Sequence, residues 1–354
     1  MRMKKLIILA AAAIAAVACS RTFDTAPAKE QAIGFGTWAE TLTKATVENT
    51  FDVNDHIGVF GVKTKSATNT TVFNNVDVKK TAASPETWTY SPKQYWDLNA
   101  VSYTFFAVSP YAATGYIVDP ATGAVSASPT IAFAGKDSDI LVAQKAVVNK
   151  TDGAGNFNSY DAVPLVFNHM AALLDVKVKM SADLYAQGAE VKITDVKLLN
   201  IDSEGTYTVT GGFTTAPTPD WTSTGTKATY NYTKGFVDAT TALNVNIANG
   251  TPTIINKLVV LPQTFRTTGT ERQQIQIAYK LKQTGGEDVQ YTPDAFDLTT
   301  FDNVDDEDNE DTAVAGWAFG THYTYIITID AQAIEFTASI QPWTEESAYH
   351  YLLN

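Results

Sequence analysis

The chain carries the stretch QIQIAYKL at residues 274–281. Its apolar residues fall at every second position, which is the period of a β-strand with one buried face and one solvent-exposed face. Residues 173–180, LLDVKVKM, repeat the pattern, because four apolar side chains alternate there with charged ones. These two stretches predict antiparallel sheets that cover a core on one side.

Short segments of the same kind recur along the chain, and each is bounded by turn residues. We predict strands at residues 31–39, 57–62, 87–90, 101–108, 139–143, 173–180, 191–199, 206–210, 228–232, 258–261, 274–281, 323–330 and 333–340. One helical turn is expected within residues 163–174, and no long helix. Many short strands without βαβ spacing predict an all-β fold made of β-sandwiches.

The first residues have the pattern of a bacterial lipoprotein signal. Three positive charges within residues 1–5 precede an uncharged apolar run, and small residues lead to Cys19, the only cysteine. The run is shorter than the roughly 20 residues that a membrane-spanning helix needs. The pattern predicts export, removal of residues 1–18 and lipid on the Cys19 thiol. An ordinary secretory signal with an incidental cysteine is the alternative.

Composition argues against several classes of function. Removing residues 1–18 takes the net charge from −13 to −16, and such an acidic surface repels phosphate backbones, so we expect no nucleic acid partner. A single cysteine excludes disulfides within the mature chain and cysteine-based zinc sites. The remaining 336 of the 354 residues exceed what one core usually organises, so we expect two domains of about 150 residues each.

No group of residues predicts catalysis or a cofactor. The four histidines lie far apart in the sequence, without the spacing of metal ligands. The glycines within residues 34–39 do not open a helix, which argues against a dinucleotide site. The acidic run 302–311 offers oxygen ligands for calcium but lacks the turn glycine of an EF-hand, so we interpret it as a solvated loop, with calcium as the alternative. We therefore predict a protein that is not an enzyme and has no metal or cofactor.

Several motifs, in this order, resemble the fimbrillin-like or Mfa-like family, whose members are subunits of type V pili. They are FDVNDHIGVF at 51–60, YW at 95–96, YTFFAVSPY at 103–111, DILVA at 139–143, LVFNHM at 165–170, LPQ at 261–263, residues 317–325 and FTASIQPW at 336–343. The likeness covers nearly the whole mature chain. The order of the motifs, together with the lipoprotein signal, makes the resemblance specific.

The resemblance implies a fold and a mode of assembly. The fold is two tandem transthyretin-like β-sandwich domains, which here would be residues 45–175 and 176–343. The family is exported to the outer membrane as lipoproteins. A trypsin-like protease then cuts after a basic residue and releases the first strand, and the carboxy-terminal strand of another subunit fills the groove by pairing with the exposed backbone.

Carried onto this sequence, the cut falls between Lys44 and Ala45, which makes residues 19–44 a tether followed by a removable first strand. Arg21 is an alternative site, but cleavage there would remove the lipid and leave the groove filled. Arginine is commoner than lysine at the cut in this family. Lys44 therefore argues against processing by a strictly arginine-specific protease.

The donor strand would be the tail of residues 344–354, in which Tyr349, Tyr351 and Leu353 share one face. Only eleven residues follow Trp343, which is short for a segment that must reach a neighbouring subunit. If the tail packs on its own domain, the chain would be a tip or anchor subunit rather than a repeating stalk subunit.

The resemblance thus implies a structural subunit of cell-surface fimbriae that serves adhesion and biofilm formation. Its expected partners are other pilin subunits, the outer membrane through the lipid on Cys19, the processing protease, and a host or bacterial surface receptor. The alternative is a lipid-anchored surface module that binds a glycan or protein without polymerising. The bond between Lys44 and Ala45 discriminates the two, because only the polymerising subunit needs it cut.

Overall fold

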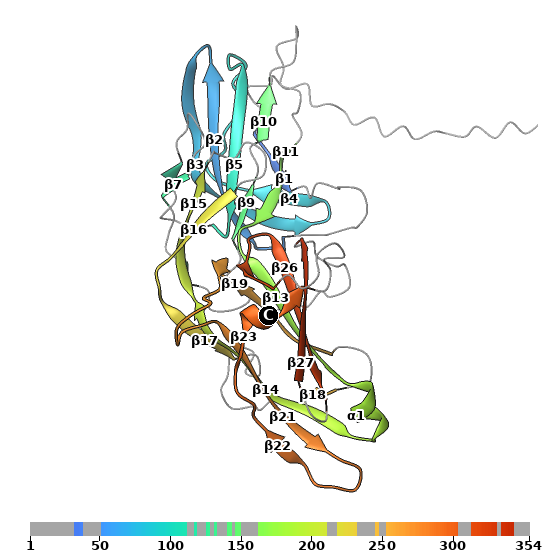
Figure 1. Cartoon of the computed structure of the whole chain (residues 1–354). Helices are drawn as coiled ribbons and strands as arrows, with labels where there is room; N and C mark the ends of the chain where they lie inside the picture. Colours follow the sequence, from blue (N-terminus) through green and yellow to red (C-terminus); the bar gives the residue numbers. More distant parts are fainter. Residues whose placement is uncertain are drawn as a thin grey trace, which may run out of the picture.

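The computed structural model describes residues 32–37, 51–111, 117–118, 125–127, 131–132, 140–143, 146–149, 162–210, 218–231, 245–247, 253–303, 313–330 and 334–342. In this part of the chain the fold is almost entirely β, which confirms the predicted fold class. The molecule is elongated, with strand β2 (His56–Lys65) toward one end and strand β22 (Val289–Tyr291) at the other (Figure 1).

The amino-terminal half is built on a seven-stranded sheet with the order β12-β9-β5-β2-β3-β4, in which β10 also pairs with β5. A separate pair of parallel strands, β1 and β11, completes this half. The strands other than β2 are β1 (Phe35–Thr37), β3 (Thr68–Ala83), β4 (Glu86–Thr89), β5 (Ser102–Ser109), β9 (Leu141–Ala143), β10 (Ala146–Asn149), β11 (Val163–Leu165) and β12 (Phe167–His169).

The carboxy-terminal half is a sandwich of two sheets. One has the order β19-β13-β26-β27-β24, and the other has the order β17-β14-β21-β22 with β18 and β23 attached. Their bounds are β13 (Ala172–Met180), β14 (Glu190–Asp202), β17 (Lys227–Asn231), β18 (Val245–Asn246), β19 (Thr253–Val260), β21 (Gln274–Lys282), β23 (Phe296–Asp297), β24 (Asp302–Asn303), β26 (Thr321–Ile329) and β27 (Ile334–Pro342). The short strands β20 (Gln263–Thr264) and β25 (Gly316–Trp317) pair with each other beside them.

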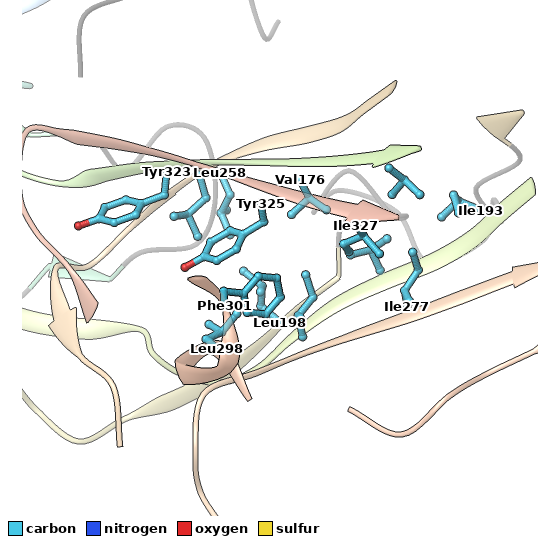
Figure 2. Close-up of a cluster of buried hydrophobic side chains, with 14 of the residues drawn as sticks. Val176, Ile193, Leu198, Leu258, Ile277, Leu298, Phe301, Tyr323, Tyr325 and Ile327 are labelled. Carbon is cyan, nitrogen blue, oxygen red and sulfur yellow. The ribbon is translucent and has the colours of Figure 1, made fainter. Parts of the chain in front are cut away.

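The core of this sandwich follows the alternation read from the sequence. Val176 and Tyr325 from one sheet pack in the same cluster as Ile193 and Ile277 from the other, and all four are fully or nearly fully buried (Figure 2). On the opposite face Lys177 and Lys179 are partly exposed, as expected, but Asp175 is buried, so the predicted solvent-exposed face is wrong at that position. Alternate residues of a strand face opposite sides of a sheet, so one stretch supplies both the core and the surface.

A further sheet contains strands from both halves. Strands β6 (Ile117–Val118), β7 (Val125–Ala127) and β8 (Ile131–Ala132) belong to the first half of the sequence, and they share a sheet with the hairpin of β15 (Glu204–Thr210) and β16 (Thr218–Ser223). In Figure 1 this hairpin lies beside the strands of the amino-terminal half.

Trp221 of β16 packs at the junction between the halves. Its ring contacts an apolar cluster that includes Phe60 and Phe106 on the amino-terminal sheet, and a second cluster that includes Leu173. Its Nε1 donates a hydrogen bond to the carbonyl of Met170, 2.8 Å away, in the connection between β12 and β13. The hairpin therefore covers the face of the amino-terminal sheet on which Phe60 and Phe106 lie. A sheet whose strands simply alternate apolar and polar residues would leave that face in solvent.

Helical structure is limited to short pieces in the described residues. Helix α1 (Ala182–Ala186) begins where the Ser181 hydroxyl accepts a hydrogen bond from the amide of Leu184, 3.1 Å away, which satisfies one of the free amides of the first turn. A 3-10 helix spans Leu298–Thr300. No helix in the described part of the chain is long and apolar enough to cross a membrane.

Two details of the sequence-based description are wrong. Residues 163–174 contain no helical turn, since they form β11, β12 and the start of β13. The longest strand, β3, was not predicted, because its sequence TNTTVFNNVDVKKTAA is mostly polar. It forms because β2 and β4 pair with it on both sides, and pairing can override a weak local preference.

The expected division at residues 175 and 176 stays a prediction. The main apolar cluster of the amino-terminal half draws on residues from Ile33 to Phe167, and that of the carboxy-terminal half begins at Ala172. Strand β13 is continuous across residue 175. We therefore propose that the division lies slightly earlier, between Phe167 and Ala172.

Candidate functional site

The first described segment of the chain, residues 32–37, is inserted into the core of the amino-terminal half; we call it the plug. Ile33 and Phe35 are 1% and 5% exposed, and both belong to the main apolar cluster of that half. They share a face because alternate residues of an extended chain point the same way.

The plug is bonded along both of its edges. On one side it runs parallel to β11, and the amide of Val163 donates to the carbonyl of Gly34 at 2.8 Å. On the other side the amide of Ile33 donates to the carbonyl of Gln94 at 2.9 Å, and the Tyr90 hydroxyl donates to the carbonyl of Ile33 at 2.7 Å. The plug thus bridges two parts of the fold that would otherwise leave a gap with unpaired backbone groups.

Phe35 is surrounded by three rings, which we call the aromatic box: Phe73 of β3, Tyr90 and Phe105 of β5. Their ring centroids lie 5.3, 5.8 and 5.7 Å from that of Phe35, in edge-to-face or tilted orientations. Aromatic pairs of this geometry contribute about 0.5–1.5 kcal/mol each beyond the area they bury. We call the space that the plug fills, lined by this aromatic box, the groove.

The Tyr90 hydroxyl binds the backbone of the plug at the carbonyl of Ile33. Burial raises the pKa of Tyr90, although its contact with the backbone of Gln94 acts in the opposite direction. The group therefore keeps its proton across the neutral range and acts as a donor toward a strand carbonyl.

Phe51, the first residue of the next described segment, packs against the same apolar cluster as the plug. Its ring packs edge-to-face on Trp88 and Phe167, at centroid distances of 5.4 and 5.0 Å. The predicted cut after Lys44 therefore lies, in the sequence, between two segments that are both packed into one apolar cluster.

The residues predicted from the sequence as sites lie outside the described residues. These are Cys19, Lys44, Ala45, Tyr349, Tyr351 and Leu353, together with Arg21 and positions 304–311 of the acidic run. The family resemblance implied a groove beneath a removable first strand, but the residues that line it were not predicted, because they come from distant segments of the chain. The alternation of Ile33 and Phe35 was the one local signal for it.

The described residues contain no group of three or more histidine, cysteine, aspartate or glutamate side chains that could hold a metal ion. His56 lies 2.7 Å from Asp77, and His322 lies 3.1 Å from the buried Asp175. Each of these two histidines thus pairs with one carboxylate, which is an arrangement that serves packing and pairing between strands.

Comparison with known families adds the deciding observation. The model of the fimbrillin-like family matches residues 43–343, which is most of the chain. The chain belongs to the fimbrillin-like family. The resemblance seen in the sequence motifs is confirmed, and the protein is accordingly a fimbrial or adhesion subunit of a cell-surface appendage.

Solved structures give a weaker likeness. A fimbrial protein from Bacteroides vulgatus is 17% identical, with 88% of this chain and 99% of that chain covered and a TM-score of 0.47. A candidate cell adhesion protein from Bacteroides uniformis is 19% identical, with 88% and 98% covered and the same TM-score of 0.47. These scores are too low to carry an argument. No curated protein matches the fimbrillin-like chain.

Proposed function

We propose that this fimbrillin-like protein is a pilus subunit that polymerises by exchanging its plug for a strand of another subunit. Cleavage between Lys44 and Ala45 would free the plug, and the emptied groove would take up the tail of a second copy. The observation that carries the proposal is the burial of Ile33 and Phe35 in the core, on a segment that pairs with only three residues of β11.

The plug is thus held by two buried apolar side chains and by only a few backbone hydrogen bonds to β11. Exposed strand edges and apolar grooves are templates for another chain, because backbone bonds supply affinity and alternate side chains supply register. The tail offers Tyr349, Tyr351 and Leu353 on one face. An aromatic side chain from that tail would replace Phe35 in the aromatic box.

The proposal includes the route to the cell surface. Lipid on Cys19 would hold the precursor at the outer membrane until a trypsin-like protease cuts it. The assembled fimbria would then serve adhesion and biofilm formation through a host or bacterial receptor.

The test compares two charge-removing variants of the full precursor isolated from the bacterial surface. Lys44→Gln removes the proposed cut, and Arg21→Gln is the matched control, because a cut at Arg21 would leave the plug in place. We expect the wild type and the Arg21 variant to begin at Ala45 and to give ladders on gels of unboiled samples, whereas the Lys44 variant stays a monomer.

Amino-terminal sequencing and intact-mass measurement would also reveal the result that contradicts the proposal. A wild-type protein that begins at a lipidated Cys19 and runs as a monomer would contradict polymerisation. That result would favour the lipid-anchored binding module that never polymerises.

A further inference from the structure

One buried charge in the amino-terminal half has no part in holding the plug. Lys80 of β3 is 4% exposed, and among the described residues no other lysine or arginine belongs to the buried set. Removing an ammonium group from water is strongly unfavourable unless the protein supplies replacement partners. An apolar side chain of similar length would fill the same space without this penalty. We therefore infer that the charge of Lys80 has a specific function.

The partners of Lys80 converge on the chain just after the proposed cut. Its Nζ donates a hydrogen bond to the carbonyl oxygen of Phe51 at 2.5 Å. A carboxylate oxygen of Glu86 lies 3.7 Å from the same Nζ, and the Trp88 ring centroid lies 5.9 Å from it. Trp88 in turn donates from Nε1 to Glu86 at 2.7 Å, which fixes the carboxylate.

The backbone of Lys80 also binds the turn that follows Phe51. The amide of Asn54 donates to the carbonyl of Lys80, and the amide of Lys80 donates to the carbonyl of Asp55, both at 2.9 Å. Asp55 also accepts a hydrogen bond from the amide of Asp52 at 2.7 Å. Residues 51–55 are therefore docked on β3 through both the side chain and the backbone of one residue.

We propose that Lys80 is a positioning residue that keeps residues 51–55 docked after the cut between Lys44 and Ala45, so that only the segment before the cut leaves the core. This inference rests on the proposed function. Phe51 and Phe35 pack into the same apolar cluster. If the new chain end followed the plug out, the core would open at two places and the groove would lose its shape.

A hydrogen bond from an ammonium group suits this task better than apolar packing alone. The bond is directional and charge-assisted, which makes it stronger than a bond between neutral groups. Its acceptor is a backbone carbonyl, so it fixes the path of the chain as well as the position of the Phe51 ring. We call this hydrogen bond from Lys80 to the carbonyl of Phe51 the latch. It separates the plug, which is removed, from residues 51–55, which stay in place.

The test measures hydrogen exchange by mass spectrometry on the full chain before and after trypsin cleavage at Lys44. In the wild type we expect the amides within residues 52–55 that donate hydrogen bonds, those of Asp52, Asn54 and Asp55, to stay protected when the plug is released. In Lys80→Met, cleavage should raise exchange at these amides by roughly tenfold or more, since a lost bond to a charged group lets the segment open more often.

The matched control is Lys63→Met, which removes another lysine of the same sheet. Lys63 pairs with Asp97 at 2.8 Å and makes its bond away from residues 51–55. Its variant should leave exchange at residues 52–55 at the wild-type rate after cleavage. Glu86→Gln should give an intermediate rate, because it keeps the Trp88 bond and removes only the charge.

The outcomes separate the latch from the proposed function. If cleavage fails to release the plug, the proposed function fails whatever happens at residues 52–55. If the plug leaves and residues 52–55 of the wild type lose protection with it, the latch is refuted even if Lys80→Met does not fold. Equal rates in Lys80→Met and Lys63→Met would refute it as well.

Discussion

Phe35→Ala should loosen the plug far more than a change one residue away. Phe35 is 5% exposed and meets three rings of the aromatic box. Replacing a buried phenylalanine by alanine removes about 3–5 kcal/mol, because packing and ring contacts are lost together. A loss of about 3 kcal/mol raises the open fraction of the plug more than a hundredfold, since about 1.4 kcal/mol is a factor of ten.

The effect has an upper limit set by the architecture. If the plug leaves its groove while the rest of the amino-terminal half stays folded, as the proposed function requires, the loss of free energy cannot exceed the free energy that docks the plug. Hydrogen exchange at the Val163 amide measures this opening directly, because that amide donates to the carbonyl of Gly34. We expect Phe35→Ala to accelerate exchange there by a hundredfold or more.

Gly34→Ala is the matched control within the plug. A methyl group at this position would meet Ala162 at 3.8 Å, which is an ordinary contact. Exchange at the Val163 amide should therefore stay close to the wild-type rate. If Phe35→Ala and Gly34→Ala gave the same rate, the aromatic box would not hold the plug, and the reasoning from its geometry would be refuted.

Two further predictions concern the walls of the groove and the junction between the halves. Burial raises the pKa of Tyr90 above that of an exposed tyrosine. Its contribution to stability is therefore complete below the unfolded-state pKa of about 10 and is lost as the pH rises through the folded-state pKa. Urea titrations at about pH 8 and about pH 11 should show a smaller loss of unfolding free energy between the two pH values in Tyr90→Phe than in the wild type. An equal loss in both proteins would contradict this assignment. Trp221→Ala should destabilise the junction by roughly 2–4 kcal/mol, because a large and partly buried ring is removed from two apolar clusters. Spin labels placed on the two halves should then report a broader distance distribution. Trp221→Phe keeps an aromatic ring but loses the bond to Met170 and part of the indole packing, so it should broaden the distribution less. An unchanged distribution in the alanine variant would show that the hairpin does not fix the junction.

Much of the fold could be predicted from the sequence. The alternation in residues 173–180 and 274–281 correctly indicated β13 and β21, together with the face that each one buries. This works because the pleat of an extended chain gives side chains a fixed period of two, whatever the strand pairs with. The order of the motifs likewise indicated the family that the family model confirms.

The strands and contacts that depend on distant partners could not be predicted in this way. Strand β3 has the composition of a solvated loop and becomes a strand through its two neighbours. No sequence pattern indicated that Trp221 packs between the two halves, beside a sheet whose strands come from both.

The sequence by itself determined that this chain is a β-rich member of the fimbrillin-like family, because composition, strand period and motif order are local properties of the chain. Only the tertiary structure decided that Phe35 fills an aromatic box and that a buried Lys80 holds Phe51. These contacts join residues that lie tens of positions apart. Their pairing depends on how whole strands dock and on the burial that results, which no local pattern records.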